Sequence, residues 1–435
     1  MIERTNHRSK ITRTVALLLL ASMVIAACTV GDDGIFATIA LERRSTTRNL
    51  NDNALILGIV QTENDQVLAL VGNQVFRRDL SSNTWSGIST PSVNGGEWRP
   101  IGLVGLDTTV NGTGVTEEHY IHASFDTTDS SAAARTVVFR MNGTSFGSIV
   151  LDSASAASPV ETIGGMEAIE NHLVVSTEDS SGTYLLYSFN NGFTADDWTV
   201  ANADSHAFPL EGAVSSGQDI VDSDVNPGNT AVFVGESGGL FRMDSTQLGT
   251  DGAPGAEDLQ LVDLPLHGSG PGPRPYGVDF GTGIAVSGTS PATVDLWIVA
   301  DGSRDTGRIF VSETANATGT WDEVDTEASL SFSDALWVGG THEALLVGTF
   351  TSVTATTSAD GLRIVNLTRS GNNLYDGTLS DDLGRSYEAV ELSDAAIRSL
   401  DLIQTTLYAQ TSGSGLWSVP LFAETTPDNR EWIWE

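Results

Sequence analysis

The sequence predicts an all-β protein built from one repeated unit, and three observations support this prediction. Short apolar strands bounded by Gly, Asn, Asp, Ser and Thr run along the whole chain, and no segment has a sustained helical period. Glycine is abundant, at 45 of 435 residues, and only 18% of residues are charged. The chain also exceeds the roughly 250–300 residues at which a single core stops growing, so we expect two domains or a core extended by repeats.

A six-residue pattern recurs seven times, with a mean period of about 57 residues. The copies cover residues 74–79, 137–142, 185–190, 239–244, 308–313, 361–366 and 415–420. An apolar strand precedes each copy, at 67–72, 119–124, 173–178, 231–236, 296–301, 345–350 and 407–412. A further strand opens each unit, at 55–60, 101–106, 163–169, 220–225, 276–280, 335–338 and 397–403.

A fourth strand follows each copy of the pattern. It is led by an aromatic residue in six units, and residues 259–264 supply it in the fourth unit; the aromatic residues are Trp85, Phe146, Trp198, Trp321, Tyr387 and Trp432. Four strands in each of seven units is the composition of a β-propeller, in which stacking around an axis buries both faces of every blade.

We therefore predict a single β-propeller over residues 54–435, with seven four-stranded blades, or eight if residues 34–53 supply further strands. Residues 431–435 can form the outer strand of the last blade. Alternatively, the apolar residues 34–41 can supply or extend that strand, and we expect some involvement of this N-terminal segment because it needs burial.

Residues 1–27 have the pattern of a secretory signal peptide. Four basic residues precede an apolar run at 15–25, and two alanines then precede Cys28. The run is shorter than the about 20 apolar residues that a membrane-spanning helix needs. Cys28 is the only cysteine, which excludes an internal disulfide.

Residues 25–28, Ile-Ala-Ala-Cys, resemble the lipobox of bacterial lipoproteins. The resemblance implies that Cys28 is lipidated and begins the mature chain, with residues 28–53 as a tether. It also implies a lipid-anchored protein of the bacterial cell envelope that faces the periplasm or the outside. Thr29 then favours the outer membrane where one exists. The alternative is an ordinary signal peptide with an incidental cysteine.

The charge balance excludes two kinds of partner. The chain has 21 Lys and Arg against 56 Asp and Glu, a net charge of -35. Loss of residues 1–27 removes four basic residues and one acidic residue, which makes the net charge of residues 28–435 -38. Such a chain lacks the basic surface that nucleic acids require, and anionic lipids would repel it.

One segment carries a second resemblance. Residues 380–387, Ser-Asp-Asp-Leu-Gly-Arg-Ser-Tyr, fit the S-x-D-x-G-x-[ST]-aromatic pattern of the BNR or Asp-box repeat, and residues 221–242 are similar to that repeat's strands. The repeat occurs in sialidases, sortilin-like receptors and photosystem assembly factors. The resemblance implies a structural turn between the outer strands of a blade, away from the channel, formed by Ser380, Asp382, Gly384, Ser386 and Tyr387.

Two motifs associated with catalysis or metal binding are weak. Residues 235–239 match the G-x-S-x-G of a nucleophile elbow, but we expect a hairpin there instead of the strand-to-helix turn that an elbow needs. Asp222, Asp224 and Asn226 have the spacing of a calcium loop, yet Pro227 and Phe233 stand where such a loop needs Gly and Glu. We interpret this segment as a solvated turn.

The histidines do not suggest a metal site. His119 and His122 are three residues apart on a predicted strand, which places them on opposite faces. The sequence predicts no metal site and no cofactor.

Charged residues in or beside the opening strands are expected to line a central channel. Polar side chains are usual in a water-filled channel, and the functional interpretation is a ligand or partner site at one mouth. The candidates are Arg99, Asp219, Asp279, Asp334, Arg398 and Asp401, with Glu167 in a similar position.

Three hypotheses for the function follow. The first is a membrane-anchored binding or scaffolding protein that recognises a protein or a glycan and is not an enzyme. The second is a sialidase-like glycoside hydrolase, which needs three arginines beside a Tyr–Glu pair. The only candidates for these arginines are Arg99, Arg274 and Arg398, and no complete catalytic set is present. The third is an assembly factor for a membrane protein complex.

Overall fold

The computed structural model describes Leu50 and, between Ile56 and Glu435, twenty-eight strands with several of their turns. Residues 1–49 and many connections, including 351–360, 381–391 and 421–431, lie outside the described residues. The predictions for the signal peptide, for Cys28 and for residues 34–41 therefore fall outside them. Leu50–Glu435 is one compact unit. Within the described part of the chain, no helix is long and apolar enough to cross a membrane.

The described strands form seven antiparallel sheets, each made of four consecutive strands. The first sheet holds β1 (Ile56–Gln61), β2 (Val67–Val71), β3 (Gln74–Asp79) and β4 (Thr84–Ile88). The second holds β5 (Gly96–Thr109), β6 (Val115–Thr127), β7 (Arg135–Asn142) and β8 (Ser145–Ile149). The third holds β9 (Val160–Ile169), β10 (His172–Asp179), β11 (Tyr184–Asn190) and β12 (Asp204–Ala207).

The other four sheets repeat this order. The fourth holds β13 (Ile220–Val225), β14 (Thr230–Gly235), β15 (Leu240–Asp244) and β16 (Gln260–Leu261). The fifth holds β17 (Pro275–Ala285), β18 (Thr293–Asp301), β19 (Arg308–Ser312) and β20 (Asp322–Val324). The sixth holds β21 (Ser331–Val338), β22 (Ala344–Phe350), β23 (Leu362–Arg369) and β24 (Tyr375–Ser380). The seventh holds β25 (Ile397–Ile403), β26 (Thr406–Thr411), β27 (Gly415–Pro420) and β28 (Ile433–Trp434).

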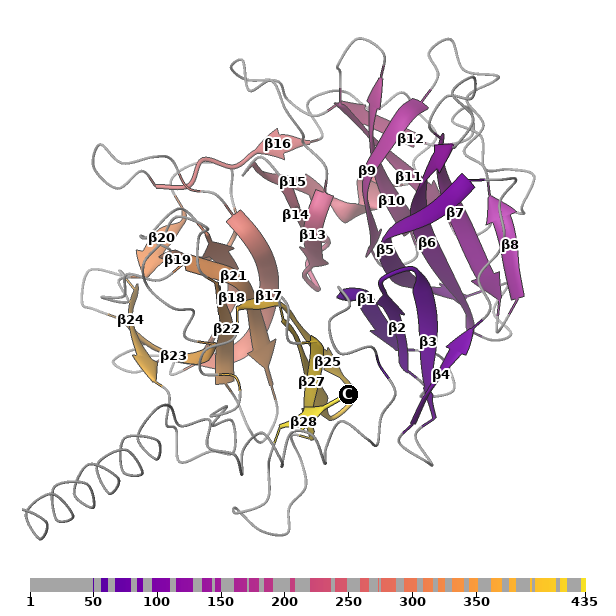
Figure 1. Cartoon of the computed structure of the whole chain (residues 1–435). Helices are drawn as coiled ribbons and strands as arrows, with labels where there is room; N and C mark the ends of the chain where they lie inside the picture. Colours follow the sequence, from indigo (N-terminus) through magenta and orange to yellow (C-terminus); the bar gives the residue numbers. More distant parts are fainter. Residues whose placement is uncertain are drawn as a thin grey trace, which may run out of the picture. The chain divides into compact units, whose positions relative to one another are not determined.

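The first strands of the sheets surround a common centre. Each contacts the first strand of the next sheet, from β1 through β5, β9, β13, β17 and β21 to β25, and β25 contacts β1. In Figure 1 these strands lie around the middle of the unit, and outer strands such as β4, β8, β20 and β28 lie toward its periphery. The fold is all-β and a single β-propeller.

The sequence repeat corresponds to the observed strands. Each copy of the six-residue pattern falls on the third strand of a sheet, and the predicted opening and second strands overlap the observed ones in every sheet. Phe76 and Phe241, for example, occupy the third strands β3 and β15. The prediction that these segments are equivalent is confirmed.

Two predicted outer strands are wrong in position. In the sixth sheet the outer strand is β24, which pairs with β23 and begins at Tyr375 instead of Tyr387. Tyr375 is almost fully buried and supplies the aromatic side chain that we expected from Tyr387. In the third sheet the outer strand β12 begins at Asp204, after the predicted Trp198.

The observed position of β24 also bears on the Asp-box pattern of residues 380–387. Ser380 is the last residue of β24 and pairs with Ile364. Ser380, the first residue of the pattern, is therefore part of the outer strand of its sheet. Asp382, Gly384, Ser386 and Tyr387 are outside the described residues.

The core lies between neighbouring sheets, which explains the apolar runs in the second strands. In β18, Leu296 to Ala300 are fully buried on both faces of the strand. One cluster joins the fifth and sixth sheets, and another joins the sixth and seventh. A third cluster joins the seventh sheet to the first and includes Leu50, Ile56 and Tyr408.

The first and last sheets are also joined by a buried polar contact around Glu435. Its carboxylate accepts hydrogen bonds from Ser418 in its own sheet and from Trp85 Nε1 of the first sheet, the latter at 2.9 Å. Arg78 Nη2 of the first sheet lies 3.1 Å from the same carboxylate, and Arg78 also donates to the hydroxyl of Tyr408. We call this contact the Glu435 latch.

We predict that Glu435→Ala lowers the free energy of unfolding by about 3–5 kcal/mol, because it leaves the buried Arg78 guanidinium without its counter-charge. Glu313→Ala is the matched control. Its carboxylate is about half exposed, pairs with Arg369 at 2.9 Å and accepts from the hydroxyl of Tyr375 at 2.9 Å, so we expect a smaller loss of about 1–2 kcal/mol. Urea denaturation of both variants checks this, and equal losses would contradict a special role for the latch.

Candidate functional site

Every first strand has an extra residue at an equivalent position in its first half. At an equivalent position in each sheet, the pairing with the second strand skips a single residue, which is a β-bulge. The skipped residues, which we call the bulge residues, are Leu57, Ile101, Gly164, Val221, Tyr276, Ser333 and Arg398.

A cavity of about 730 Å³ lies among the first strands, and all seven of them contribute to its lining. Four bulge residues line it: Leu57, Tyr276, Ser333 and Arg398. A bulge changes the direction in which side chains leave a strand. The bulges therefore bring residues of different chemistry to one central space.

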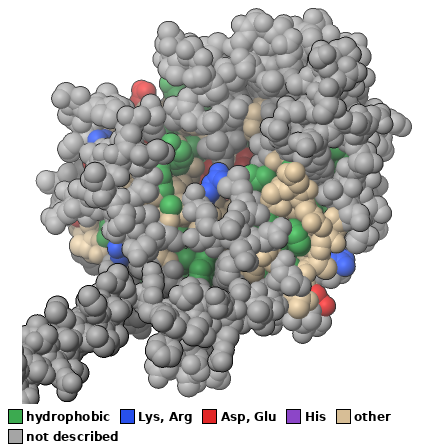
Figure 2. Space-filling view, in the orientation of Figure 1, with side chains coloured by type: hydrophobic (Ala, Val, Ile, Leu, Met, Phe, Trp, Pro, Cys, Tyr) green, Lys and Arg blue, Asp and Glu red, His purple; other side chains and the backbone are tan. Residues whose placement is uncertain are grey.

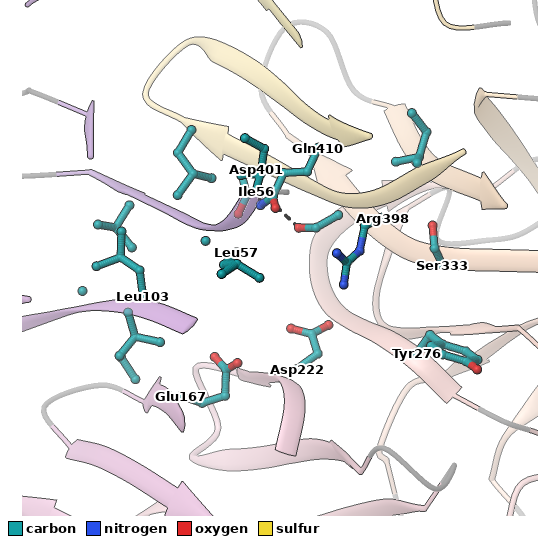
Figure 3. Close-up of a pocket in the computed structure, with 18 of the residues that line it drawn as sticks. Ile56, Leu57, Leu103, Glu167, Asp222, Tyr276, Ser333, Arg398, Asp401 and Gln410 are labelled. Carbon is teal, nitrogen blue, oxygen red and sulfur yellow. Dashed lines mark hydrogen bonds between the residues drawn. The ribbon is translucent and has the colours of Figure 1, made fainter. Parts of the chain in front are cut away.

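The lining is polar on one side and apolar on the other. In Figure 3 the side chains of Arg398, Asp222 and Glu167 point toward the same space, and Leu57 lies across from them. Ile56 and Leu103 extend the apolar side. Figure 2 shows basic and acidic side chains next to apolar ones near the middle of this face.

Several carboxylates of the first strands bind backbone N–H groups of the next sheet. Asp222 Oδ2 accepts from the N–H of Val278 at 2.6 Å, and Asp224 Oδ2 accepts from Phe280 at the same distance. Asp334 Oδ2 accepts from Leu400 at 2.7 Å, and Asp279 accepts from Trp337. A first strand has an unpaired inner edge, so these carboxylates satisfy N–H groups that have no strand partner.

Burial raises the pKa of these carboxyl groups despite the hydrogen bonds. Desolvation raises the pKa of Asp334 to about 7, although the N–H groups of Leu400 and Ala335 oppose the shift. The pKa values of Asp222 and Asp279 lie well above their usual range, first through desolvation and then through neighbouring carboxylates. The carboxyl groups at the centre of the propeller therefore keep their protons to a higher pH than exposed carboxyl groups do.

Two further carboxyl groups, those of Glu167 and Asp401, lie in the first strands β9 and β25. Asp401 accepts hydrogen bonds from Gln410 Nε2 at 2.9 Å and Ser399 Oγ at 3.3 Å, and desolvation raises its pKa to about 6. Desolvation, with repulsion from Asp401, raises the pKa of Glu167 to about 8. Because its pKa is about 8, Glu167 is mostly protonated at pH 7 and can donate a hydrogen bond as well as accept one. Both residues line the cavity.

The structure brings some of the predicted site residues together. Arg398 and Asp401 line the cavity, and Asp279 and Asp334 lie in first strands as acceptors for the next sheet. Arg99 lies in β5 opposite Ser124, two residues before the bulge residue of its strand. Asp219 and Arg274 are outside the described residues.

The arginine set of a sialidase is not assembled by the described residues. Among the lining side chains that the structure describes, Arg398 is the one arginine. Tyr276 and Glu167 line the same cavity, although we had not singled out Tyr276 or Asp222 as cavity residues. Asp222 had been interpreted as part of a solvated turn, and that interpretation is wrong for Asp222 and Asp224, which lie in β13.

The turn after β13 explains the rest of that calcium-like spacing. Asn226 Oδ1 accepts from the N–H groups of Gly228 and Thr230, at 3.0 and 2.8 Å, and so stabilises the turn. Asp222 and Asp224 reach instead to β17. In the part of the chain that the structure describes, no three His, Cys, Asp or Glu residues are grouped to hold a metal ion.

The G-x-S-x-G match lies in a hairpin, as expected. β14 ends at Gly235, β15 begins at Leu240, and the N–H of Gly235 donates to the carbonyl of Gly239 at 2.8 Å. A strand follows the motif, so it lacks the helix that a nucleophile elbow requires.

Comparison with known proteins gives similarity of fold alone. No family model and no curated protein matches the chain. The extracellular domain of the putative one component system BT4673 from B. thetaiotaomicron is 10% identical, with a TM-score of 0.47, over 86% of this chain and 39% of that one. This chain thus spans about two fifths of that structure.

Two further solved structures have a similar arrangement. YCF48 bound to D1 peptide is 12% identical, with a TM-score of 0.48, over 85% of this chain and 92% of that chain. A catalytically inactive virginiamycin B lyase from Staphylococcus aureus, with quinupristin, is 13% identical, with a TM-score of 0.42, over 86% and 97% of the two chains.

We predict that Asp334→Asn flattens the pH dependence of stability, whereas Asp334→Ala destabilises the fold. The folded-state pKa of about 7 exceeds the usual value of 3.8 for an aspartate. Asp334 therefore favours the folded state at low pH and loses this contribution as pH rises from about 4 to about 7. Asparagine keeps an acceptor for Leu400 without the charge. Alanine leaves that N–H unpaired, at a cost of about 1–3 kcal/mol.

Urea denaturation between pH 4 and pH 8 tests both variants. The free energy of unfolding of Asp334→Asn should fall less steeply with pH than that of the parent protein. A slope identical to the parent's would show that Asp334 does not hold a proton in the folded state.

Proposed function

We propose that the protein is a lipid-anchored, extracytoplasmic binding and scaffolding protein that recognises a protein or a glycan at the face of its propeller containing the cavity. We also propose that each of the seven four-stranded sheets is one blade, with residues 28–53 as the tether to the anchor. The observation that carries the binding role is the central cavity, which has a mixed lining supplied by all seven first strands.

The roles of the carboxylates favour binding over catalysis. Asp222, Asp279 and Asp334 accept hydrogen bonds from backbone N–H groups, so their positions are accounted for by the architecture. The exposed guanidinium of Arg398 and the exposed ring of Tyr276 stand out against this structural set. Both side chains are exposed to a ligand in the cavity, and the ring of Tyr276 also packs against Phe350 of the next sheet.

A glycoside hydrolase is the second candidate, and one observation favours it. Tyr276 and Glu167 line the cavity that also contains Arg398, and the raised pKa of Glu167 suits a general acid. An assembly factor for a membrane protein complex is the third candidate. In that case the partner would be a protein and the acidic surface would help to select it.

The anchor can be tested by intact-mass analysis of the protein from bacterial membranes. We predict a chain of residues 28–435 carrying acyl groups on Cys28, since residues 25–28 have the lipobox pattern. We also expect Cys28→Ser to release the protein from the membrane fraction. An unmodified thiol, or a Cys28→Ser form that stays membrane-bound, would refute the anchor.

The binding role can be tested by crosslinking and affinity capture from native membranes, together with a fluorogenic glycoside panel. We predict a specific captured partner or glycan and no turnover. Arg398→Ala should abolish capture, because it removes the cation of the cavity, whereas Arg77→Ala, on β3 and away from the lining, should not. Turnover that disappears with Arg398→Ala would establish the hydrolase instead.

A further inference from the structure

The size of the cavity identifies the kind of group that it can hold. Its volume of about 730 Å³ lies within the roughly 300–1,000 Å³ typical of small-ligand sites. A protein partner is normally recognised over about 800 Å² of each surface. A compact group, such as one or two sugar rings or a single side chain, therefore matches the cavity better than an extended protein surface does.

The polar lining offers both hydrogen-bond donors and acceptors. Arg398 is exposed and donates only, whereas the carboxyl groups of Asp222 and Glu167 accept, and Glu167 can also donate when protonated. Each hydroxyl of a ligand is at once a donor and an acceptor. A ligand with several hydroxyl groups can therefore satisfy both sets without leaving a buried group unpaired.

The charge distribution argues against either kind of ion. An anion would meet Arg398 but also the carboxyl group of Asp401, whose pKa of about 6 leaves it mostly ionised near pH 7. A cation would meet the guanidinium of Arg398, and Glu167 carries little negative charge near pH 7 to attract it. A neutral ligand avoids both penalties.

The remaining lining suits the apolar face of a sugar ring. Tyr276 is 40% exposed, and its ring is held edge-on by Phe350, with centroids 5.5 Å apart. A side chain at Gly302 would collide with the Tyr276 ring, at 2.4 Å from its Cδ2. The ring is therefore fixed in place as a surface against which C–H groups can pack.

We propose that the central cavity binds a neutral sugar unit of a glycan, with Arg398, Asp222 and Glu167 contacting its hydroxyl groups and Tyr276 and Leu57 contacting its C–H faces. This inference rests on the proposed binding role and names its ligand class. It assigns recognition to the bulge residues Leu57, Tyr276 and Arg398 together with Glu167 and Asp222. Asp224, Asp279 and Asp334 keep a structural role, and Asp222 combines its contact to the ligand with its hydrogen bond from the N–H of Val278.

The test is binding of the full mature chain, in detergent, to an array of neutral glycans that also carries sialylated glycans and acidic and basic peptides. Calorimetry then measures affinity for the strongest neutral glycan. Arg398→Gln and Tyr276→Ala should each weaken binding about tenfold or more, because each removes a contact to the ligand. Arg77→Gln removes the same charge outside the cavity and should change the affinity less than twofold.

Thermal unfolding of each variant verifies folding, and Tyr276→Phe separates the ring from its hydroxyl. Tyr276→Phe should keep most of the affinity if the ring is the main contact. Preference for sialylated glycans or for a charged peptide would overturn the inference. So would neutral-glycan binding that is unchanged in both Arg398→Gln and Tyr276→Ala.

Failure of this inference is distinguishable from failure of the proposed function. If no neutral glycan binds while capture from membranes still yields one stoichiometric protein partner, the sugar site is refuted and the binding role survives. If neither a glycan nor a protein is bound, both are refuted.

Discussion

The unpaired inner edge of each first strand is the constraint on which the centre of this propeller depends. Seven such edges face one another, and their N–H groups cannot be left without acceptors in a confined space. Asp222 and Asp334 supply acceptors by reaching one sheet forward. At the same position of the first sheet stands Gly58, where a Cβ would lie 2.7 Å from the carbonyl oxygen of Leu103. Glycine thus permits direct approach of the next sheet, whereas Asp222 and Asp334 reach the next sheet through a side-chain carboxylate.

This solution determines the electrostatics of the cavity. Carboxylates placed for their hydrogen bonds also repel one another, and burial deprives them of water, so their pKa values rise. Protonation then relieves part of the repulsion. A chain with a net charge of -35 can therefore have a central space whose effective charge near neutral pH is far lower than its count of acidic residues suggests. The positive charge of Arg398 offsets part of the negative charge that remains.

The sequence located the strands that are buried on both faces, and it located the outer strands less well. Second strands such as β18 are buried on both sides, which produces continuous apolar runs that are easy to recognise. Outer strands are short and pair with a single neighbouring strand. Trp198 and Tyr387 were therefore assigned to strands that begin elsewhere, at Asp204 and Tyr375. Aromatic residues alone do not locate such strands.

The cavity was only partly predictable because its lining depends on the bulges. One inserted residue reverses which side of a strand the preceding positions face, so alternation cannot assign Tyr276 or Arg398 to the cavity. A local signal does exist. In every first strand the bulge residue precedes Gly, Asp or Ser, as in Leu57-Gly58, Val221-Asp222 and Arg398-Ser399. This pair recurs with the repeat and marks the bulge, and four of the seven bulge residues line the cavity.

Closure of the ring and composition of the cavity involve the same two sheets. β1 supplies much of the apolar lining and β25 supplies Arg398 and Asp401, and these strands contact each other where the ring closes. No strand is exchanged between the first and last sheets in the described part of the chain. Their union depends instead on an apolar cluster and on the Glu435 latch at the outer strands. The apolar cluster and the latch therefore join the sheet that supplies much of the apolar lining to the sheet that supplies Arg398 and Asp401.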